Sequence, residues 1–150
     1  MLKDYTIEDL KKDCEENELD FEQMHKIVED WDAKKWALFF HDGGAMFIED
    51  IDLLDIDDSP VKYDGQELLI LTDDEAEEQW DEQLDSYIEW EVLSEIPEHL
   101  RFYFDDVRYK DNLKLDCRAS WLASYDGDEN QYRIDFDDGS SQYIYIYRVN

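Results

Sequence analysis

Carboxylates are the side chains of this sequence that could do chemistry, and they are concentrated between Thr72 and Glu95. The 23 residues after Thr72 include 11 acids and no Lys or Arg. In a helix these charges would follow one another at roughly one per 3 Å of axis, close to the spacing of about 3.4 Å per phosphate along each strand of duplex DNA. We therefore expect an anionic array that binds basic side chains in the place of phosphates.

The pattern around these carboxylates predicts one long helix from Thr72 to Glu95. Thr72 and Glu75 have the spacing of a capping box, in which each side chain accepts from a free amide of the first turn. Apolar residues at three- and four-residue steps predict a buried stripe of Ala76, Trp80, Leu84, Tyr87, Ile88 and Val92. The outward face would carry Glu78, Asp81 or Glu82, Asp85 and Glu89 at about 6 Å intervals. The alternative is a face that only keeps the chain soluble.

A second acidic segment, EDIDLLDIDDSP, precedes the helix and interleaves six acids with apolar residues. We predict that both segments bind the partner, through Glu49, Asp50, Asp52, Asp55, Asp57, Asp58, Asp74, Glu77, Glu78, Asp81, Glu82, Asp85 and Glu89. An EF-hand loop starting at Asp55 fails, because its glycine position is Pro60 and its final glutamate position is Gln66. No metal or cofactor is expected.

The chain as a whole is strongly acidic but has the composition of a folded protein. Its 150 residues carry a net charge of −29, with 43% hydrophobic and 15% aromatic residues. Residues 36–100 hold 21 of the 43 acids and only one base, Lys62. This clustering favours a directed field, which repels nucleic acid and membranes and attracts basic proteins.

Enzymatic and membrane-spanning classes are not expected. The sequence has no HExxH, GxSxG, P-loop or GxGxxG motif, and its three histidines stand in unrelated contexts. No apolar run approaches the roughly 18 residues that cross a bilayer, and no signal-peptide apolar region is present. Cys14 and Cys117 stand alone, without metal-ligand spacing. These features indicate a cytoplasmic binding protein with reduced cysteines.

The elements that position the carboxylates predict an α+β fold. Short helices would begin at Thr6 and Asp20, and residues 36–48 would form a β-hairpin around an Asp-Gly-Gly turn. Residues 61–71 would supply one or two strands before the long helix. The chain would close with an antiparallel β-meander of strands 119–124, 132–136 and 142–148. It would divide into subdomains 1–71 and 72–150, or form one continuous domain.

The run IPEHLRFYFDDVRYKDNLKLD, residues 96–116, combines a proline turn with a capped helix. Phe102, Tyr103 and Phe104 would fill the core, and Asp105 or Asp106 would cap the helix. This run resembles the C-terminal part of the ArdA antirestriction proteins of phages and conjugative elements. The likeness extends over about residues 72–150 and ends at Tyr147-Arg148, whereas residues 1–70 do not match that family. The resemblance implies an elongated acidic dimer that mimics DNA in the groove of type I restriction enzymes.

The closing strand offers one way to assemble such a dimer. Alternation of side chains would point Ile144 and Ile146 to the core and place Tyr143, Tyr145 and Tyr147 in a row on the other face. This row would form the dimer interface, or would instead lie beneath one of the chain's own helices.

Charge, fold and resemblance together predict a DNA-mimic inhibitor of a host defence nuclease, from a restriction-modification or CRISPR system. It would act in the cytoplasm of the bacterial host and contact no nucleic acid directly. The alternative is an acidic binding module or chaperone for a basic cellular protein. A metal-dependent enzyme or Ca²⁺ buffer is a third, weaker hypothesis.

Overall fold

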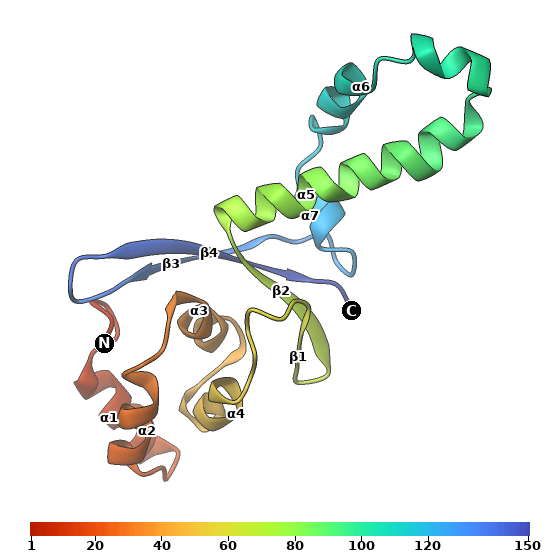
Figure 1. Cartoon of the computed structure of the whole chain (residues 1–150). Helices are drawn as coiled ribbons and strands as arrows, with labels where there is room; N and C mark the ends of the chain where they lie inside the picture. The colour runs from red at the N-terminus through yellow and green to blue at the C-terminus, as the bar shows by residue number, and fades with distance from the viewer.

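The computed structural model describes residues 1–150 and has a four-stranded antiparallel sheet at its centre (Figure 1). Its strands are β1 (Val61–Tyr63), β2 (Gln66–Thr72), β3 (Asn130–Asp135) and β4 (Ser141–Arg148), in the order β1-β2-β4-β3. Helices cover both faces of this sheet. The predicted α+β class is confirmed, and the single sheet joins strands from both of the segments 1–71 and 72–150.

Strand β2 and the C-terminal part of β4 are buried on both faces, and their sequences explain why. Leu68 and Ile70 of β2 pack on one side of the sheet, and Leu69 and Leu71 pack on the other. A continuous apolar run of this kind is typical of a strand covered on both faces. In β4 the two sides differ in chemistry, since isoleucines face one layer and tyrosines the other.

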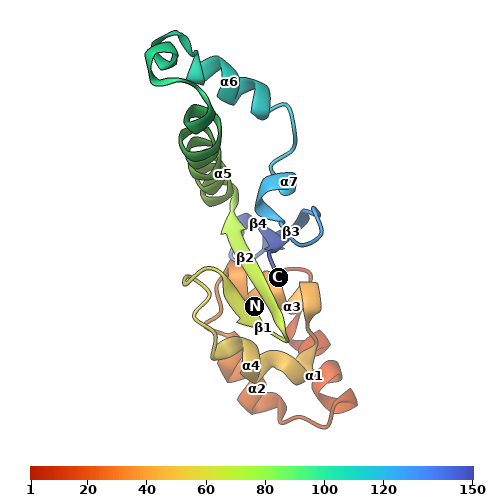
Figure 2. The ribbon, with the colours of Figure 1, turned by 90° about the vertical axis from the view of Figure 1, so that its right-hand side faces the viewer.

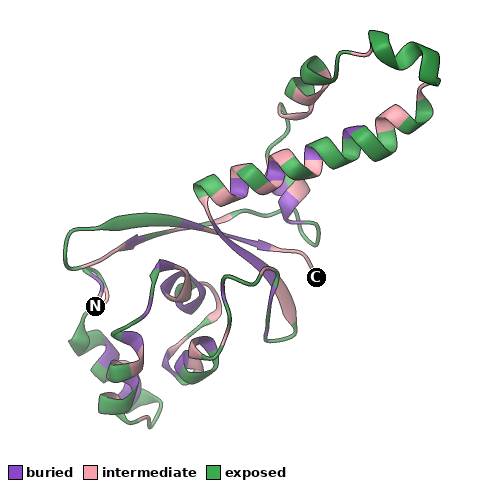
Figure 3. Ribbon diagram, in the orientation of Figure 1, coloured by how far each residue is buried: buried purple, intermediate pink, exposed green.

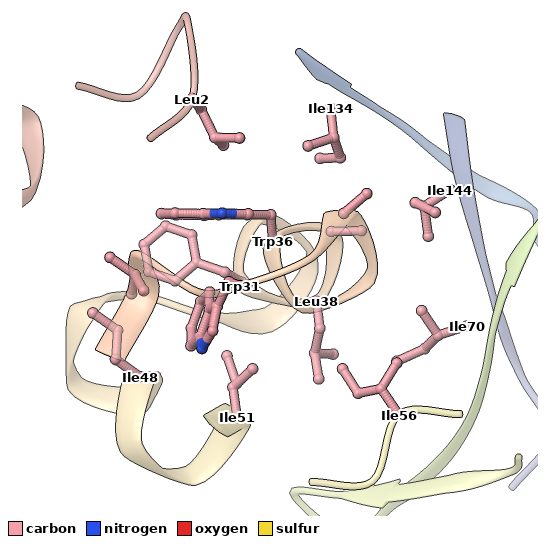
Figure 4. Packing of buried hydrophobic residues seen from close by; sticks show 14 of the residues in the cluster. Leu2, Trp31, Trp36, Leu38, Ile48, Ile51, Ile56, Ile70, Ile134 and Ile144 are labelled. Atoms are coloured by element: carbon pink, nitrogen blue, oxygen red, sulfur yellow. The ribbon is translucent and has the colours of Figure 1, made fainter. Parts of the chain in front are cut away.

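The N-terminal helices form the layer on the isoleucine side of the sheet. They are α1 (Ile7–Glu16), α2 (Phe21–Val28), α3 (Ala33–Asp42), the 3-10 turn η1 (Ala45–Phe47) and α4 (Ile48–Asp52). Thr6 and Asp20 cap the first two helices, as predicted. Figure 4 shows Trp36 near Leu2 and Trp31 near Ile48 and Ile51 of α4, and all of these belong to the same buried cluster as Ile134 and Ile144 of the sheet.

The hairpin predicted at residues 36–48 is wrong, because this segment is helical. Asp32 caps α3 by accepting a hydrogen bond from the backbone N–H of Lys35. Helical spacing then buries Trp36 and Phe39 in the core. Gly43 ends the helix, where a Cβ atom would lie 2.1 Å from the carbonyl oxygen of Phe39. A short apolar run does not by itself distinguish a buried helix from a strand.

The opposite face of the sheet is covered by α5 (Asp73–Tyr87) and the short α7 (Ala119–Leu122). Thr72 and Glu75 form the predicted capping box. The helix continues through a π turn, η2 (Ile88–Val92), and a 3-10 turn, η3 (Leu93–Glu95), so the predicted helix to Glu95 is confirmed. Its buried stripe consists of Ala76, Trp80, Leu84 and Ile88.

Beyond the sheet, the chain forms a projecting arm that we define as residues 89–118 (Figures 1 and 2). The end of the long helix leads to the 3-10 helix η4 (Glu98–Tyr103), and α6 (Asp106–Leu113) then returns toward the sheet. Asp105 caps α6, as predicted. The prediction that Phe102 and Tyr103 fill the core is wrong, since they are 90% and 80% exposed, and Phe104 is half-buried.

The predicted C-terminal meander is only partly correct. Residues 130–135 and 141–148 are strands, but residues 119–122 form α7. The third strand next to this pair is β2, which pairs with β4 over Leu68–Thr72. Ala119 and Leu122 are buried against α5 instead, because helical spacing lets both face the same helix.

Candidate partner-binding surface

The long helix sorts its carboxylates into two rows that run along its axis. The inner row faces residues 110–118 and consists of Asp73, Glu77, Asp81 and Asp85. The outer row faces solvent and consists of Asp74, Glu78, Glu82 and Glu89. Residues three and four apart lie on one side of a helix, so each row follows from the spacing of its members.

The inner row is paired with basic side chains of the same chain. Lys110 Nζ lies 2.9 Å from Asp85 Oδ1, and Lys114 Nζ lies 2.6 Å from Asp81 Oδ1. The Lys114 ammonium holds the pKa of Asp81 below its usual range, and the Asp85 carboxylate raises the pKa of Lys110. Asp81 and Asp85 therefore face α6. The prediction that Asp85 lies on the free outward face is wrong, and of the alternatives Asp81 and Glu82 it is Glu82 that makes no ion pair.

Arg118 pairs with the other two carboxylates of the inner row. It is the most buried of the three basic residues that face this row. Its side chain is only 11% exposed, and Nη1 lies 2.8 Å from both Asp73 and Glu77. Nε donates to Glu129 at 3.0 Å and to the Tyr147 hydroxyl at 2.9 Å. Burial alone would lower the pKa of Arg118, but the carboxylates around it raise that pKa. Arg118 thus links α5 to the sheet and to the loop before β3.

Two members of the predicted tyrosine row, Tyr145 and Tyr147, are covered by other parts of the chain, and Tyr143 is exposed. Tyr147 is fully buried and donates a hydrogen bond to Glu129. The Arg118 guanidinium covers the ring of Tyr145 at 4.5 Å, while Tyr143 remains 44% exposed. Tyr147 therefore cannot form an interface with a second copy, and the alternative of cover by the chain itself describes Tyr145 and Tyr147 but not Tyr143.

The outer row is the part of the helix that is free to bind a partner. All four of its carboxylates are exposed, and none makes an ion pair or a side-chain hydrogen bond within the chain. Asp74, Glu78 and Glu82 follow one another at steps of about 6 Å. From Asp74 to Glu89 the row extends for about 22 Å along the helix axis.

The second acidic segment also contains both carboxylates that have a partner within the chain and carboxylates that have none. Asp52 accepts a hydrogen bond from Trp31 Nε1 at 3.0 Å and lies 3.7 Å from Lys35 Nζ, and Glu49 accepts from Gln23. Asp57 lies 3.4 Å from Lys34 Nζ. Three of the predicted acids are exposed without a partner: Asp50, Asp55 and Asp58.

Lys34 connects this second segment to the long helix. Its Nζ lies 2.9 Å from Glu75 as well as near Asp57. Burial would raise the pKa of Glu75, but the backbone N–H of Thr72 and the Lys34 ammonium hold it below its usual value. The structure therefore brings the two predicted acidic segments together at the start of α5.

Sequence reasoning missed the basic residues that pair with the inner row. Lys110, Lys114 and Arg118 are spaced by four residues, like the acids that they face. This shared spacing was the available signal, but the two sets lie about 35 residues apart in the chain. Which side of the acidic helix the basic residues would face depends on the path of the arm.

We expect that removing the two lysines of α6 loosens the arm. α6 has no buried side chain, and two exposed ion pairs contribute about 1 kcal/mol together. Lys110→Gln with Lys114→Gln should therefore raise amide hydrogen exchange of α6 about five-fold. The matched control is Lys12→Gln with Lys62→Gln, which removes the same charge far from the arm. Equal exchange of α6 in both variants would contradict a role of the ion pairs in holding the arm.

Comparisons of the chain with protein-family models, with curated proteins and with solved structures found no match. The resemblance of residues 72–150 to the ArdA proteins therefore stays a prediction from the sequence. None of the helices combines the length and the apolar character needed to cross a membrane.

Proposed function

We propose that this protein is a DNA-mimic inhibitor of a host defence nuclease and that it acts in the cytoplasm of a bacterial host. The observation that carries the proposal is the outer row, a set of unpaired carboxylates on a helix that projects from the sheet, three of which follow at steps of about 6 Å. Each Lys or Arg that pairs with one of these carboxylates is unavailable to a DNA phosphate.

The inner row supports this mode of binding. Three basic side chains already pair with its carboxylates at four-residue spacing, at distances of 2.6 to 2.9 Å. The outer row has the same spacing from Asp74 to Glu82, with no basic residue of the chain against it. A partner that presents Lys and Arg along a groove can make the equivalent contacts.

The unpaired acids of the second segment extend the surface. Asp55 and Asp58 flank Asp57, which is tied through Lys34 to the first turn of α5. A basic groove that follows the outer row can therefore continue toward these carboxylates. The charge of −29 adds long-range attraction, which raises the rate of association with a basic partner.

Competition with DNA tests the proposal. Purified restriction and CRISPR nuclease complexes would be mixed with labelled duplex DNA and increasing amounts of the protein. We expect release of the DNA from the targeted complex, with an apparent affinity that falls in proportion to the DNA concentration. Raising the salt from 50 to 200 mM should weaken the inhibition, because exposed charges are screened.

Two results would contradict DNA mimicry. Equal binding to the free and the DNA-loaded nuclease would place the contact outside the DNA groove. Failure to displace DNA from any complex, with capture of basic ribosomal or histone-like proteins from a bacterial lysate, would favour the binding module for a basic cellular protein.

A further inference from the structure

A hollow of about 610 Å³ opens on the side of the long helix, where α7 packs beside it. Glu82, Tyr87, Trp90 and Glu91 line it from the long helix, and Trp121 lines it from α7. Figure 3 shows the far end of the long helix coloured mainly as exposed. Because Glu82 also belongs to the outer row, the hollow is part of the same free surface.

Three aromatic side chains line the hollow. The ring centroids of Tyr87 and Trp121 lie 5.4 Å apart in an edge-to-face contact. Trp90 belongs to neither core and is 70% exposed, whereas tryptophan is on average highly buried. It lies in the π turn η2, and such turns within helices are frequent at functional sites. The aromatic surface of the hollow is therefore available to a ligand.

The charge of the hollow indicates the sign of this ligand. The carboxylates of Glu82 and Glu91 are exposed and make no ion pair within the chain. No Lys or Arg is among the lining residues. These two carboxylates repel an anion and attract a cation, and the faces of aromatic rings also attract cations. The hollow is therefore suited to a cationic group.

The chain's own arginines show how such a group is held. The Arg118 guanidinium lies 4.5 Å from the ring of Tyr145 and pairs with Glu129 at 3.0 Å. The Arg133 guanidinium lies 5.9 Å from the ring of Tyr143 and pairs with a carboxylate at 3.1 Å. Aromatic ring and carboxylate thus act together at both arginines. The hollow offers the same two groups, and no arginine or lysine of the chain lies over its rings.

We propose that the hollow binds an arginine side chain of the partner protein. The planar guanidinium stacks on the ring of Trp90 while its N–H groups donate to a carboxylate of the hollow. The ammonium of lysine is a compact, strongly hydrated charge and does not stack in this way. This inference rests on the proposed function, since it names how a basic partner is recognised. The outer row attracts any basic side chain, and the hollow selects arginine.

The position of the hollow makes this contact a centre of binding energy. Tryptophan and arginine are enriched among the few residues that dominate protein interfaces, where they fill pockets. The outer-row carboxylates, by comparison, form exposed ion pairs of small individual strength. A partner groove that presents an arginine beside Glu82 is therefore favoured over a groove of equal charge that presents lysine there.

Nuclear magnetic resonance of the tryptophan indole N–H groups tests the site directly. The probes are octa-arginine and octa-lysine peptides, which carry equal charge. We expect octa-arginine to shift the signals of Trp90 and Trp121, and octa-lysine to shift them less. Trp31 and Trp36 lie in the other core and should not respond. The signal of Trp90 is identified by its loss in the Trp90→Leu variant.

The Trp90→Leu variant also tests the contribution of the ring. It should bind octa-arginine about four-fold more weakly than the wild type, and octa-lysine equally well, because a cation–π contact at an exposed site corresponds to a factor of this size. The net charge stays at −29, and the fold should persist because Trp90 is largely exposed. The control is Phe102→Leu, which removes a 90% exposed ring outside the hollow and should bind both peptides like the wild type. Calorimetry measures the affinities.

Two results would overturn the arginine site: equal shifts of Trp90 with both peptides, or a Trp90→Leu variant that keeps the wild-type affinity for octa-arginine. The nuclease assay is read separately. Trp90→Leu should need about four-fold more protein to release the labelled DNA. If no nuclease releases its DNA but octa-arginine still binds the hollow in preference to octa-lysine, DNA mimicry fails and the arginine site stands.

Discussion

Conversion of Asp74, Glu78, Glu82 and Glu89 to their amides is expected to weaken inhibition of the nuclease about 30-fold without unfolding the protein. Each exposed ion pair with the partner contributes about 0.5 kcal/mol, so four contribute about 2 kcal/mol, which corresponds to a factor of about 30. Amides keep nearly the shape of the carboxylates, and none of the four carboxylates pairs within the chain. The measurement is the concentration of protein that releases half of the labelled DNA.

The matched control removes four charges from the other end of the molecule. Glu15, Glu16, Glu22 and Glu29 lie on or next to α1 and α2, are exposed and make no ion pair. Their conversion to amides changes the net charge by the same four units. If both quadruple variants lose inhibition equally, the protein acts through its total charge and not through the outer row. If the outer-row variant inhibits as well as the wild type, this row is not the binding surface.

The long helix was predictable because its signals are local. The capping box at Thr72 and Glu75 and the apolar spacing of Ala76, Trp80 and Leu84 lie within 13 residues of one another. The caps at Thr6 and Asp20 are equally local, and these predictions are confirmed. A helix start depends on hydrogen bonds between near neighbours in the sequence. The residues that specify it therefore lie within a few positions of one another.

The errors arose where distant parts of the chain decide the structure. Residues 36–48 have apolar runs that suit a strand or a buried helix, and packing of Trp36 and Phe39 under the sheet decides for the helix. Residues 119–124 have the same ambiguity, and packing of Ala119 and Leu122 against α5 decides for the helix. Phe102 and Tyr103 are aromatic, but the arm carries them away from both cores.

The candidate site was predictable in composition but not in orientation. The sequence places the carboxylates on a helix, yet the division into a paired inner row and a free outer row depends on Lys110, Lys114 and Arg118. These basic residues reach the helix only because the arm turns back along it. Asp85 was therefore assigned to the free face, and Asp81 and Glu82 were left as alternatives, whereas Glu78 and Glu89 are exposed without an ion pair as predicted.

Replacement of Arg118 by Met is expected to lower the free energy of unfolding by about 2 kcal/mol. Removing one partner of a fully buried ion pair costs about 3 to 5 kcal/mol. The cost is smaller here, because Asp73, Glu77 and Glu129 are 60, 47 and 35% exposed and keep part of their hydration. Met retains the aliphatic stem of Arg118, so the loss reports the ion pairs of the guanidinium together with its contact with the Tyr145 ring. Urea unfolding, followed by circular dichroism, measures the effect.

Arg133→Met is the control for this result. Arg133 also pairs with a carboxylate, Asp135 at 3.1 Å, and lies over a tyrosine ring, that of Tyr143. Its side chain is 60% exposed, so its loss should cost only about 0.5 kcal/mol. Both variants change the net charge equally, so repulsion across the molecule cancels in the comparison. Equal urea midpoints would contradict a special role of Arg118 in fastening the acidic helix to the sheet. A lower midpoint for Arg118→Met alone would mean that the inner row stabilises the fold, which leaves the outer row as the part of the helix available for binding.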